Sequence, residues 1–194
     1  MKKRITLTNR VVVSDPCYDI PTWCQIILNN VLPGGYITAP FDYDAGGGWG
    51  LRNAVLFAVH EQYVNDTLHW RKTPGEVGVD SGQAGIFSYD TFKNDSIASQ
   101  MVVPEFAYDG RPFVLPNKSL PGDDWYEQIS RMTLSVEGYG AYDQGCASRS
   151  GVGDGGYVCY TAKKNGMVVG IAIDFHIIKT GNKVLNMLVD EVIR

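Results

Sequence analysis

Short apolar runs between glycine- and proline-rich turns dominate the hydrophobic pattern of the chain. The two clearest pairs are Tyr36–Phe41 with Ala54–His60, and Tyr157–Thr161 with Met167–Phe175. The first pair flanks a glycine-dense connection and the second flanks Asn165-Gly166, so both connections hold residues that tolerate positive φ. Each pair therefore predicts an antiparallel hairpin. Pro40 predicts that its strand lies at an edge or carries a bulge. Further strands are expected at Val11–Val13, Glu76–Val79 and Ala84–Phe87.

One segment has a strong helical pattern. Asp124 with Glu127 forms a capping box, which predicts a helix of about three turns. The apolar face of this helix recurs at helical spacing and consists of Trp125, Ile129 and Met132.

Weaker patterns predict two more helices. Thr22 with Gln25 forms a second capping box and indicates a short helix over Trp23–Asn30. Another short helix is expected around residues 92–100. Residues 104–122 are expected to form a loop or lid, and Val184–Ile193 is compatible with either a strand or a short helix.

The pattern as a whole predicts one α+β domain over residues 1–194. Its sheet is expected to be mostly antiparallel, as a sandwich or roll, with two or three short helices. The composition agrees, because 44% apolar and 20% charged residues are ordinary values for a globular protein.

The charge balance limits the classes of partner. The net charge is −4, and the 17 Lys and Arg residues are scattered, which argues against broad nucleic-acid binding because that usually needs a basic face. No segment resembles a targeting peptide or approaches the roughly 18 apolar residues of a membrane-spanning helix. We therefore expect no membrane association and a cytoplasmic location, in the host cytoplasm if the source is viral.

The four cysteines indicate free thiols. Paired C-x-x-C spacing is missing among Cys17, Cys24, Cys146 and Cys159. A zinc site is therefore not expected. Disulfides are not expected either, because no secretory signal is recognised.

Three segments combine hydroxyls, carboxylates and small residues beside predicted strands. They are Ser14–Tyr18, Asp80–Gln83 and Ser148–Tyr157. Loops held by a sheet often build binding sites. If these loops converge, the candidate ligand-binding residues are Asp15, Cys17, Asp80, Ser81, Gln83, Ser148, Ser150 and Asp154. The alternative is that each segment is simply a turn, because Asp, Ser and Gly favour turns.

The glycine run Gly151–Gly156 is compatible with a backbone nest that binds an anion. It does not match a dinucleotide fingerprint, because a strand rather than a helix follows it, and no Gly-Lys-Ser/Thr marks a P-loop. Both standard nucleotide motifs are therefore excluded.

The residue sequences of the polar motifs, and their order along the chain, resemble those of a known family. The strings are Val-Val-Ser-Asp-Pro-Cys-Tyr, Gly-Val-Asp-Ser-Gly-Gln-Ala-Gly-Ile-Phe and Ser-Gly-Val-Gly-Asp-Gly-Gly-Tyr. Together with a Trp/Gly hairpin and a helix beginning Trp-Tyr, they resemble the bacterial and phage family called domain of unknown function 4241. The resemblance covers most of the chain and implies one intact domain and a microbial or viral source. It implies no reaction, and Arg149 stands where the family often has a hydroxyl residue.

The leading hypothesis is a small-molecule-binding protein whose polar loops hold a polar or phosphorylated metabolite. A phage source would make capture of a host signal plausible. One alternative is a hydrolase that uses Cys17, or a metal held by Asp15, Asp80 and Asp154. Another is a protein-interaction module that uses aromatic loops around Trp49 and Tyr139–Tyr142. Enzymatic activity, any cofactor and the oligomeric state stay open.

Overall fold

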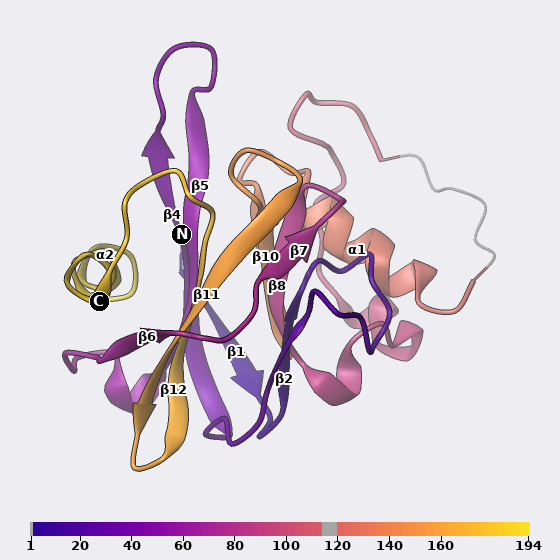
Figure 1. Cartoon of the computed structure of the whole chain (residues 1–194). Helices are drawn as coiled ribbons and strands as arrows, with labels where there is room; N and C mark the ends of the chain where they lie inside the picture. Colours follow the sequence, from indigo (N-terminus) through magenta and orange to yellow (C-terminus); the bar gives the residue numbers. More distant parts are fainter. Residues whose placement is uncertain (1, 114–119) are drawn as a thin grey trace.

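The chain folds into two antiparallel sheets that pack face to face, with one α-helix on each outer side (Figure 1). The computed structural model describes residues 2–113 and 120–194. The seven-stranded sheet contains β1 (Lys3–Leu7), β4 (Gly34–Asp44), β5 (Leu51–His60), β12 (Met167–Asp174), β11 (Gly155–Lys164), β6 (Trp70–Lys72) and β7 (Val77–Val79). The five-stranded sheet contains, in spatial order, β3 (Ile26–Leu28), β2 (Val11–Ser14), β8 (Gln83–Ser88), β10 (Gly145–Arg149) and β9 (Tyr139–Tyr142). The predicted α+β class with mostly antiparallel pairing is confirmed.

Apolar side chains fill three interfaces between these layers. The largest cluster lies between the sheets and includes Val11 and Ile86 from one sheet and Leu56 and Ile173 from the other. Helix α2 (Asn182–Val192) packs Leu185 and Val189 on the outer face of the seven-stranded sheet.

Helix α1 (Asp123–Thr133) covers the outer face of the five-stranded sheet. Its Trp125 and Ile129 are fully buried against Phe87 and Ala147. The predicted helix and its apolar face are therefore confirmed, but the N-cap is Gly122 and Asp124 lies within the first turn, so the helix does not begin at the predicted capping box. The other helical segments of the described residues are 3₁₀ turns at Glu61–Tyr63, Tyr89–Thr91 and Asp95–Gln100.

Both predicted hairpins are present. Strand β4 pairs with β5, and β11 pairs with β12 through Asn165 and Gly166, whose φ values are 51° and 80°. The last residue of β4 that pairs with β1 is Thr38, so Pro40 has a strand partner on one side only. A bulge follows directly, between Phe41 and Asp42. The expectation for Pro40 is confirmed, because this part of β4 is paired on one side only and carries a bulge.

The helix predicted over Trp23–Asn30 is wrong. Ile26–Leu28 is strand β3, which pairs with β2 and buries Ile26 and Leu28 between the sheets. Half of the capping-box geometry still forms, because the Thr22 N–H donates to Gln25 Oε1 at 2.8 Å. Here this hydrogen bond stabilises a turn. The following residues are stabilised more by pairing with the sheet edge than by forming a helix.

The remaining expectations are resolved in part. Residues 92–100 contain the 3₁₀ helix Asp95–Gln100, and the ambiguous run near the C-terminal end is helix α2. In the expected loop over residues 104–122, residues 114–119 lie outside the described residues. None of the helices in the described ranges is long and apolar enough to cross a lipid bilayer.

Candidate functional site

The first two polar loops are joined by the Asp15 carboxylate, which is fully buried where β2 ends. Asp15 Oδ2 accepts the N–H of Asp80 at 2.8 Å and the N–H of Ser81 at 2.7 Å. Asp15 Oδ1 accepts the Ser81 hydroxyl at 2.6 Å and the Cys17 N–H at 2.8 Å. Four donors therefore converge on one carboxylate, from its own loop and from the turn between β7 and β8.

The third loop joins this cluster at Gly82. Asp154 Oδ1 accepts the Gly82 N–H at 3.1 Å, and the Ser150 N–H donates to the Gly82 carbonyl at 3.0 Å. The Ser150 hydroxyl is used within its own turn, where it donates to Gly153 O at 2.6 Å. The three polar loops thus meet in space, and the site residues Asp15, Cys17, Asp80, Ser81, Ser150 and Asp154 lie in or beside one hydrogen-bonded cluster.

Two of the candidate residues point elsewhere. Gln83 Oε1 accepts the Thr133 hydroxyl at 2.6 Å, and Gln83 Nε2 donates to Ser130 Oγ at 3.1 Å, so this side chain anchors α1. Ser148 is buried, and its hydroxyl donates to Arg149 O at 3.1 Å. A ligand contact for any of the eight candidates stays a prediction.

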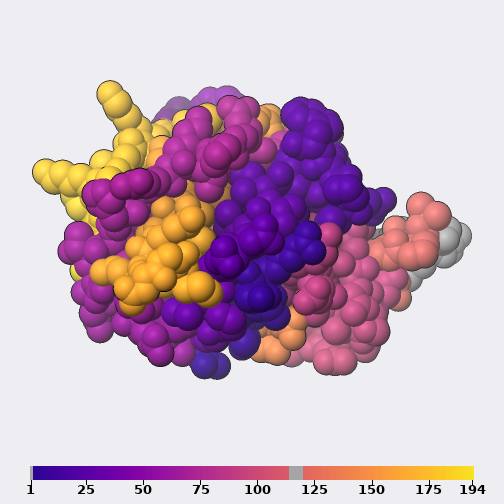
Figure 2. All heavy atoms as spheres, turned by 60° about the horizontal axis from the view of Figure 1, so that its bottom comes forward, coloured from indigo at the N-terminus to yellow at the C-terminus, as the bar shows by residue number. Residues whose placement is uncertain are grey.

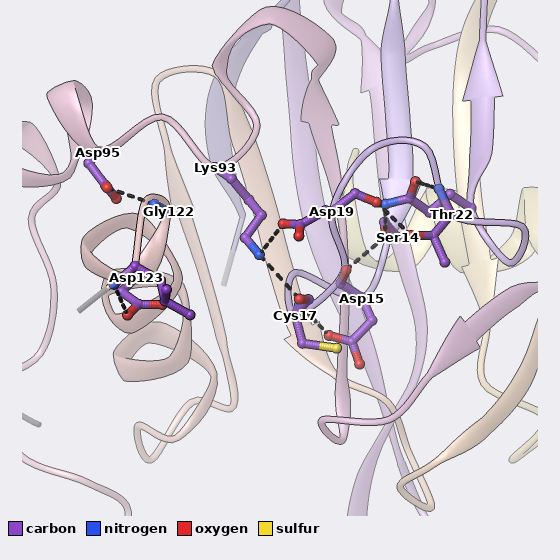
Figure 3. A network of polar contacts seen from close by, with 11 residues as sticks. Ser14, Asp15, Cys17, Asp19, Thr22, Lys93, Asp95, Gly122 and Asp123 are labelled. Carbon is purple, nitrogen blue, oxygen red and sulfur yellow. Dashed lines mark hydrogen bonds and ion pairs between the residues drawn. The ribbon is translucent and has the colours of Figure 1, made fainter. Parts of the chain in front are cut away.

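The loop around Cys17 is tied down from two sides. Lys93 Nζ forms an ion pair with Asp19 at 2.7 Å and donates to Cys17 O at 3.2 Å (Figure 3). On the other side, the Tyr18 hydroxyl donates to Asp80 Oδ2 at 2.6 Å. These contacts hold the loop in one position.

The electrostatics of the cluster oppose nucleophilic chemistry at Cys17. Burial, reinforced by the Asp15 carboxylate, raises the pKa of the Cys17 thiol to about 12. A thiol with that pKa is protonated at neutral pH, whereas a cysteine nucleophile needs a lowered pKa or an adjacent base. The four cysteines are free thiols.

The geometry of the cluster also argues against a metal site at Asp15. Both oxygens of Asp15 already accept N–H or O–H donors, and the oxygens of a metal ligand must instead face the ion. Within the described ranges, no group of three or more His, Cys, Asp or Glu side chains could hold a metal ion. The hydrogen bonds of Asp15 and Asp154 to Cys17, Asp80, Ser81 and Gly82 therefore fix the three loops relative to one another. This cluster is called the polar clasp below.

A cavity lies elsewhere in the molecule, where the edge strand β3 of the five-stranded sheet approaches the seven-stranded sheet. It is a groove of about 680 Å³ lined by residues of β3, β6, β11 and β12 and of the segments beside them. Its lining residues are Gln25, Ile26, Ile27, Leu28, Asn29, His69, Arg71, Lys72, Thr73, Pro74, Thr161, Lys163 and Val168. Figure 2 looks onto the side of the molecule where the β11–β12 hairpin, in orange, lies against the N-terminal third of the chain.

Main-chain hydrogen bonds tie the segments that flank β3 to the other sheet. The Gly78 N–H donates to Cys24 O at 2.9 Å on one side of β3. On the other side, the Val168 N–H donates to Asn30 O at 2.9 Å, and the Leu32 N–H donates to Val168 O at 2.9 Å. The groove is therefore built into the junction of the sheets.

Positive charge gathers along this groove. Arg71, Lys72 and Lys163 are exposed lining residues, and no Asp or Glu is among the described lining residues. In the part of the chain that the structure describes, none of these three cations forms an ion pair. Lys164, next to Lys163, instead pairs with Asp66 at 2.8 Å.

The sequence pattern could not locate this groove. Arg71 and Lys163 are far apart along the chain, and they come together only because β6 pairs with β11, with Arg71 opposite Thr161. The one available signal was the basic pair Arg71-Lys72 beside His69.

Comparisons of the chain with protein-family models, with curated proteins and with solved structures found no match. The resemblance to the family of unknown function therefore stays a prediction.

Proposed function

We propose that this protein binds a small anionic molecule, of the phosphorylated metabolite class, in the groove between β3 and β6. The observation that carries this proposal is that Arg71 and Lys163, two cations without ion-pair partners, lie opposite the groove-lining residues Thr161 and Val168 in an acidic chain. The ligand class is the one expected from the sequence, and the site is a different one.

The size and lining of the groove suit such a ligand. A volume of about 680 Å³ falls within the usual range of roughly 300–1,000 Å³ for small-molecule sites. The Arg71 guanidinium offers a planar fork that matches a phosphate, and the lysines offer point charges. Gln25, Asn29 and Thr73 add polar groups that could orient the rest of the ligand.

The polar clasp is less suited to a phosphate than the groove. Asp15, Asp80 and Asp154 place three carboxylates in or beside it, and like charges repel an anionic ligand. The donors that face Asp15 are already used by that carboxylate. A phosphate there would have to displace an internal hydrogen bond.

The test is a thermal-shift screen followed by calorimetric titration. The panel contains inorganic phosphate, nucleoside mono- and diphosphates, and sugar phosphates. We expect at least one of these compounds to raise the melting temperature and to bind less tightly at higher salt, because the cations are solvent-exposed.

Charge-removal variants assign the binding to the groove. Arg71→Ala and Lys163→Ala should each weaken binding by about tenfold, which is the loss of one charge-assisted contact. Lys164→Ala is the matched control, because that lysine is adjacent in sequence and pairs with Asp66. No stabilisation across the panel, or equal affinity of the Lys163 and Lys164 variants, would refute the proposal.

A further inference from the structure

A second, smaller cavity of about 200 Å³ lies at the base of the long β4–β5 hairpin and shares no lining residue with the groove. Four separate segments contribute to its wall. The lining residues are Asp42, Leu51, Arg52, Asn53, Val136, Glu137, Arg149 and Gly151. Two arginines and two carboxylates therefore line one small space.

Arg149 is held rigidly in this wall. Its Nε donates to Thr133 O at 2.8 Å, its second guanidinium nitrogen donates to Ser135 O, and the Tyr108 ring lies 5.1 Å from its guanidinium carbon. Burial lowers the pKa of Arg149 and the positive charge of Arg52 lowers it further, whereas Tyr108 and the Asp42 carboxylate act in the opposite direction. Two main-chain carbonyls and the Tyr108 ring thus hold this guanidinium in place, while no carboxylate forms an ion pair with it in the described part of the chain.

Arg52 has an unused donor. Its Nε atom is buried and has no hydrogen-bond acceptor among the described residues. The guanidinium carbon lies 5.6 Å from the centre of the Trp49 ring, which is 56% exposed. A buried N–H without an acceptor is costly, so an anionic group in the cavity would remove a penalty.

The two carboxylates lie near these arginines without pairing with them directly, and the charge of Asp42 acts to raise the pKa of Arg149. Neither Asp42 nor Glu137 forms an ion pair with Arg52 or Arg149 in the described part of the chain. Asp42 Oδ1 instead accepts Asn53 Nδ2 at 2.5 Å, and Glu137 is exposed. The cavity therefore presents both signs of charge side by side, which disfavours a dianion and favours a ligand that carries both.

We propose that this cavity binds a zwitterionic small molecule of the α-amino acid class. The carboxylate would face Arg52 and Arg149, and the ammonium group would face Asp42 and Glu137. The volume of about 200 Å³ matches one amino acid rather than a peptide or a nucleotide. Leu51 and Val136 are 69% and 79% exposed at the rim, so an apolar side chain is favoured.

The test compares three probes by calorimetric titration of the whole protein. Leucine carries both charges and an apolar side chain, N-acetylleucine lacks the ammonium group, and 3-methylbutylamine lacks the carboxylate. We expect leucine to bind at least about tenfold more tightly than either analogue, because each analogue leaves one pair of charged residues without a partner. Equal binding of leucine and N-acetylleucine, or no binding of any apolar amino acid, would overturn the proposal.

Two variants assign the binding to this cavity. Arg52→Met and Glu137→Gln should each weaken leucine binding by about tenfold. Glu137→Gln should not weaken the binding of N-acetylleucine, because that compound has no ammonium group. Arg111→Met is the matched control, because Arg111 pairs with Asp109 and does not line the cavity. Unchanged leucine affinity in both cavity variants would also overturn the proposal, and none of these results depends on anion binding in the groove.

Discussion

The Asp15 carboxylate and Ser81 are joined twice, across 66 positions of sequence. Asp15 Oδ2 accepts the Ser81 N–H at 2.7 Å, and Asp15 Oδ1 accepts the Ser81 hydroxyl at 2.6 Å. Through these bonds the end of β2 determines the position of the turn between β7 and β8. The same turn contains Gly82, whose N–H donates to Asp154 of the third loop.

Asp15→Asn is expected to destabilise the fold strongly. The amide would place an NH₂ donor against one set of the N–H and O–H donors that now face the carboxylate, which leaves buried donors without acceptors. We expect the free energy of unfolding to fall by about 3 kcal/mol in urea denaturation, since hydrogen bonds to a charged group are worth roughly 1.5–3 kcal/mol each.

Asp154→Asn is the matched control for Asp15→Asn. Asp154 is exposed and accepts one hydrogen bond, from Gly82. Asp154→Asn should lower the free energy of unfolding by less than about 1 kcal/mol. If the two variants lose similar stability, Asp15 is not the acceptor that holds the loops together.

Gly140→Ala tests how closely α1 approaches the five-stranded sheet. A Cβ at Gly140 would lie 2.3 Å from Met132 Cβ and 2.5 Å from Met132 Cγ, so helix and strand would have to move apart. We expect the free energy of unfolding to fall by about 1–3 kcal/mol, the usual cost of overpacking.

The control is Gly48→Ala in the exposed tip of the β4–β5 hairpin, where an added methyl group would have nothing within 4 Å. That variant should change stability by less than about 0.5 kcal/mol. Equal stability of the two variants would mean that α1 has room to shift on its sheet.

The buried thiols predict a loss of stability at alkaline pH. Burial raises the pKa of both Cys146 and Cys159 from 9.0 to about 12. Above pH 9 the unfolded chain therefore loses these protons before the folded protein does, and stability falls as the pH rises between about 9 and 12. From pH 8 to pH 10 each thiol should contribute a loss of about 1.4 kcal/mol.

Urea denaturation at pH 8 and pH 10 checks this prediction in the native protein and in a variant with Cys146→Ala and Cys159→Ala. The variant is expected to start from a lower stability, because both substitutions leave small cavities. Its loss between the two pH values should be smaller than that of the native protein by about 3 kcal/mol, for two thiols. Equal losses would show that the two thiols ionise as easily in the folded state as in the unfolded state.

Local chemistry was enough to predict most of the elements. Asn165 and Gly166 adopt the positive φ that a tight hairpin needs, and Trp125, Ile129 and Met132 form the buried face that their spacing predicts. These features depend on residues close together in the chain, so they can be predicted from local sequence alone.

Local chemistry failed where a distant partner decided the outcome. The capping-box pattern of Thr22 and Gln25 predicts a helix, yet Ile26–Leu28 pairs with β2 and forms a strand. Pairing with the sheet edge buries Ile26 and Leu28 and therefore stabilises this segment more than a short helix would, because a short isolated helix is only marginally stable in water.

The candidate sites also depend partly on local sequence and partly on tertiary contacts. The sequence by itself singled out the polar loops of Asp15, Asp80 and Asp154, because each lies beside a strand and is rich in turn residues. The folded structure shows that the hydrogen-bonding groups of these loops pair with one another. It also shows that cations without ion-pair partners lie together in two other places, Arg71 with Lys163 and Arg52 with Arg149. Charge compensation depends on which side chains meet in space, and strand pairing between distant segments determines that.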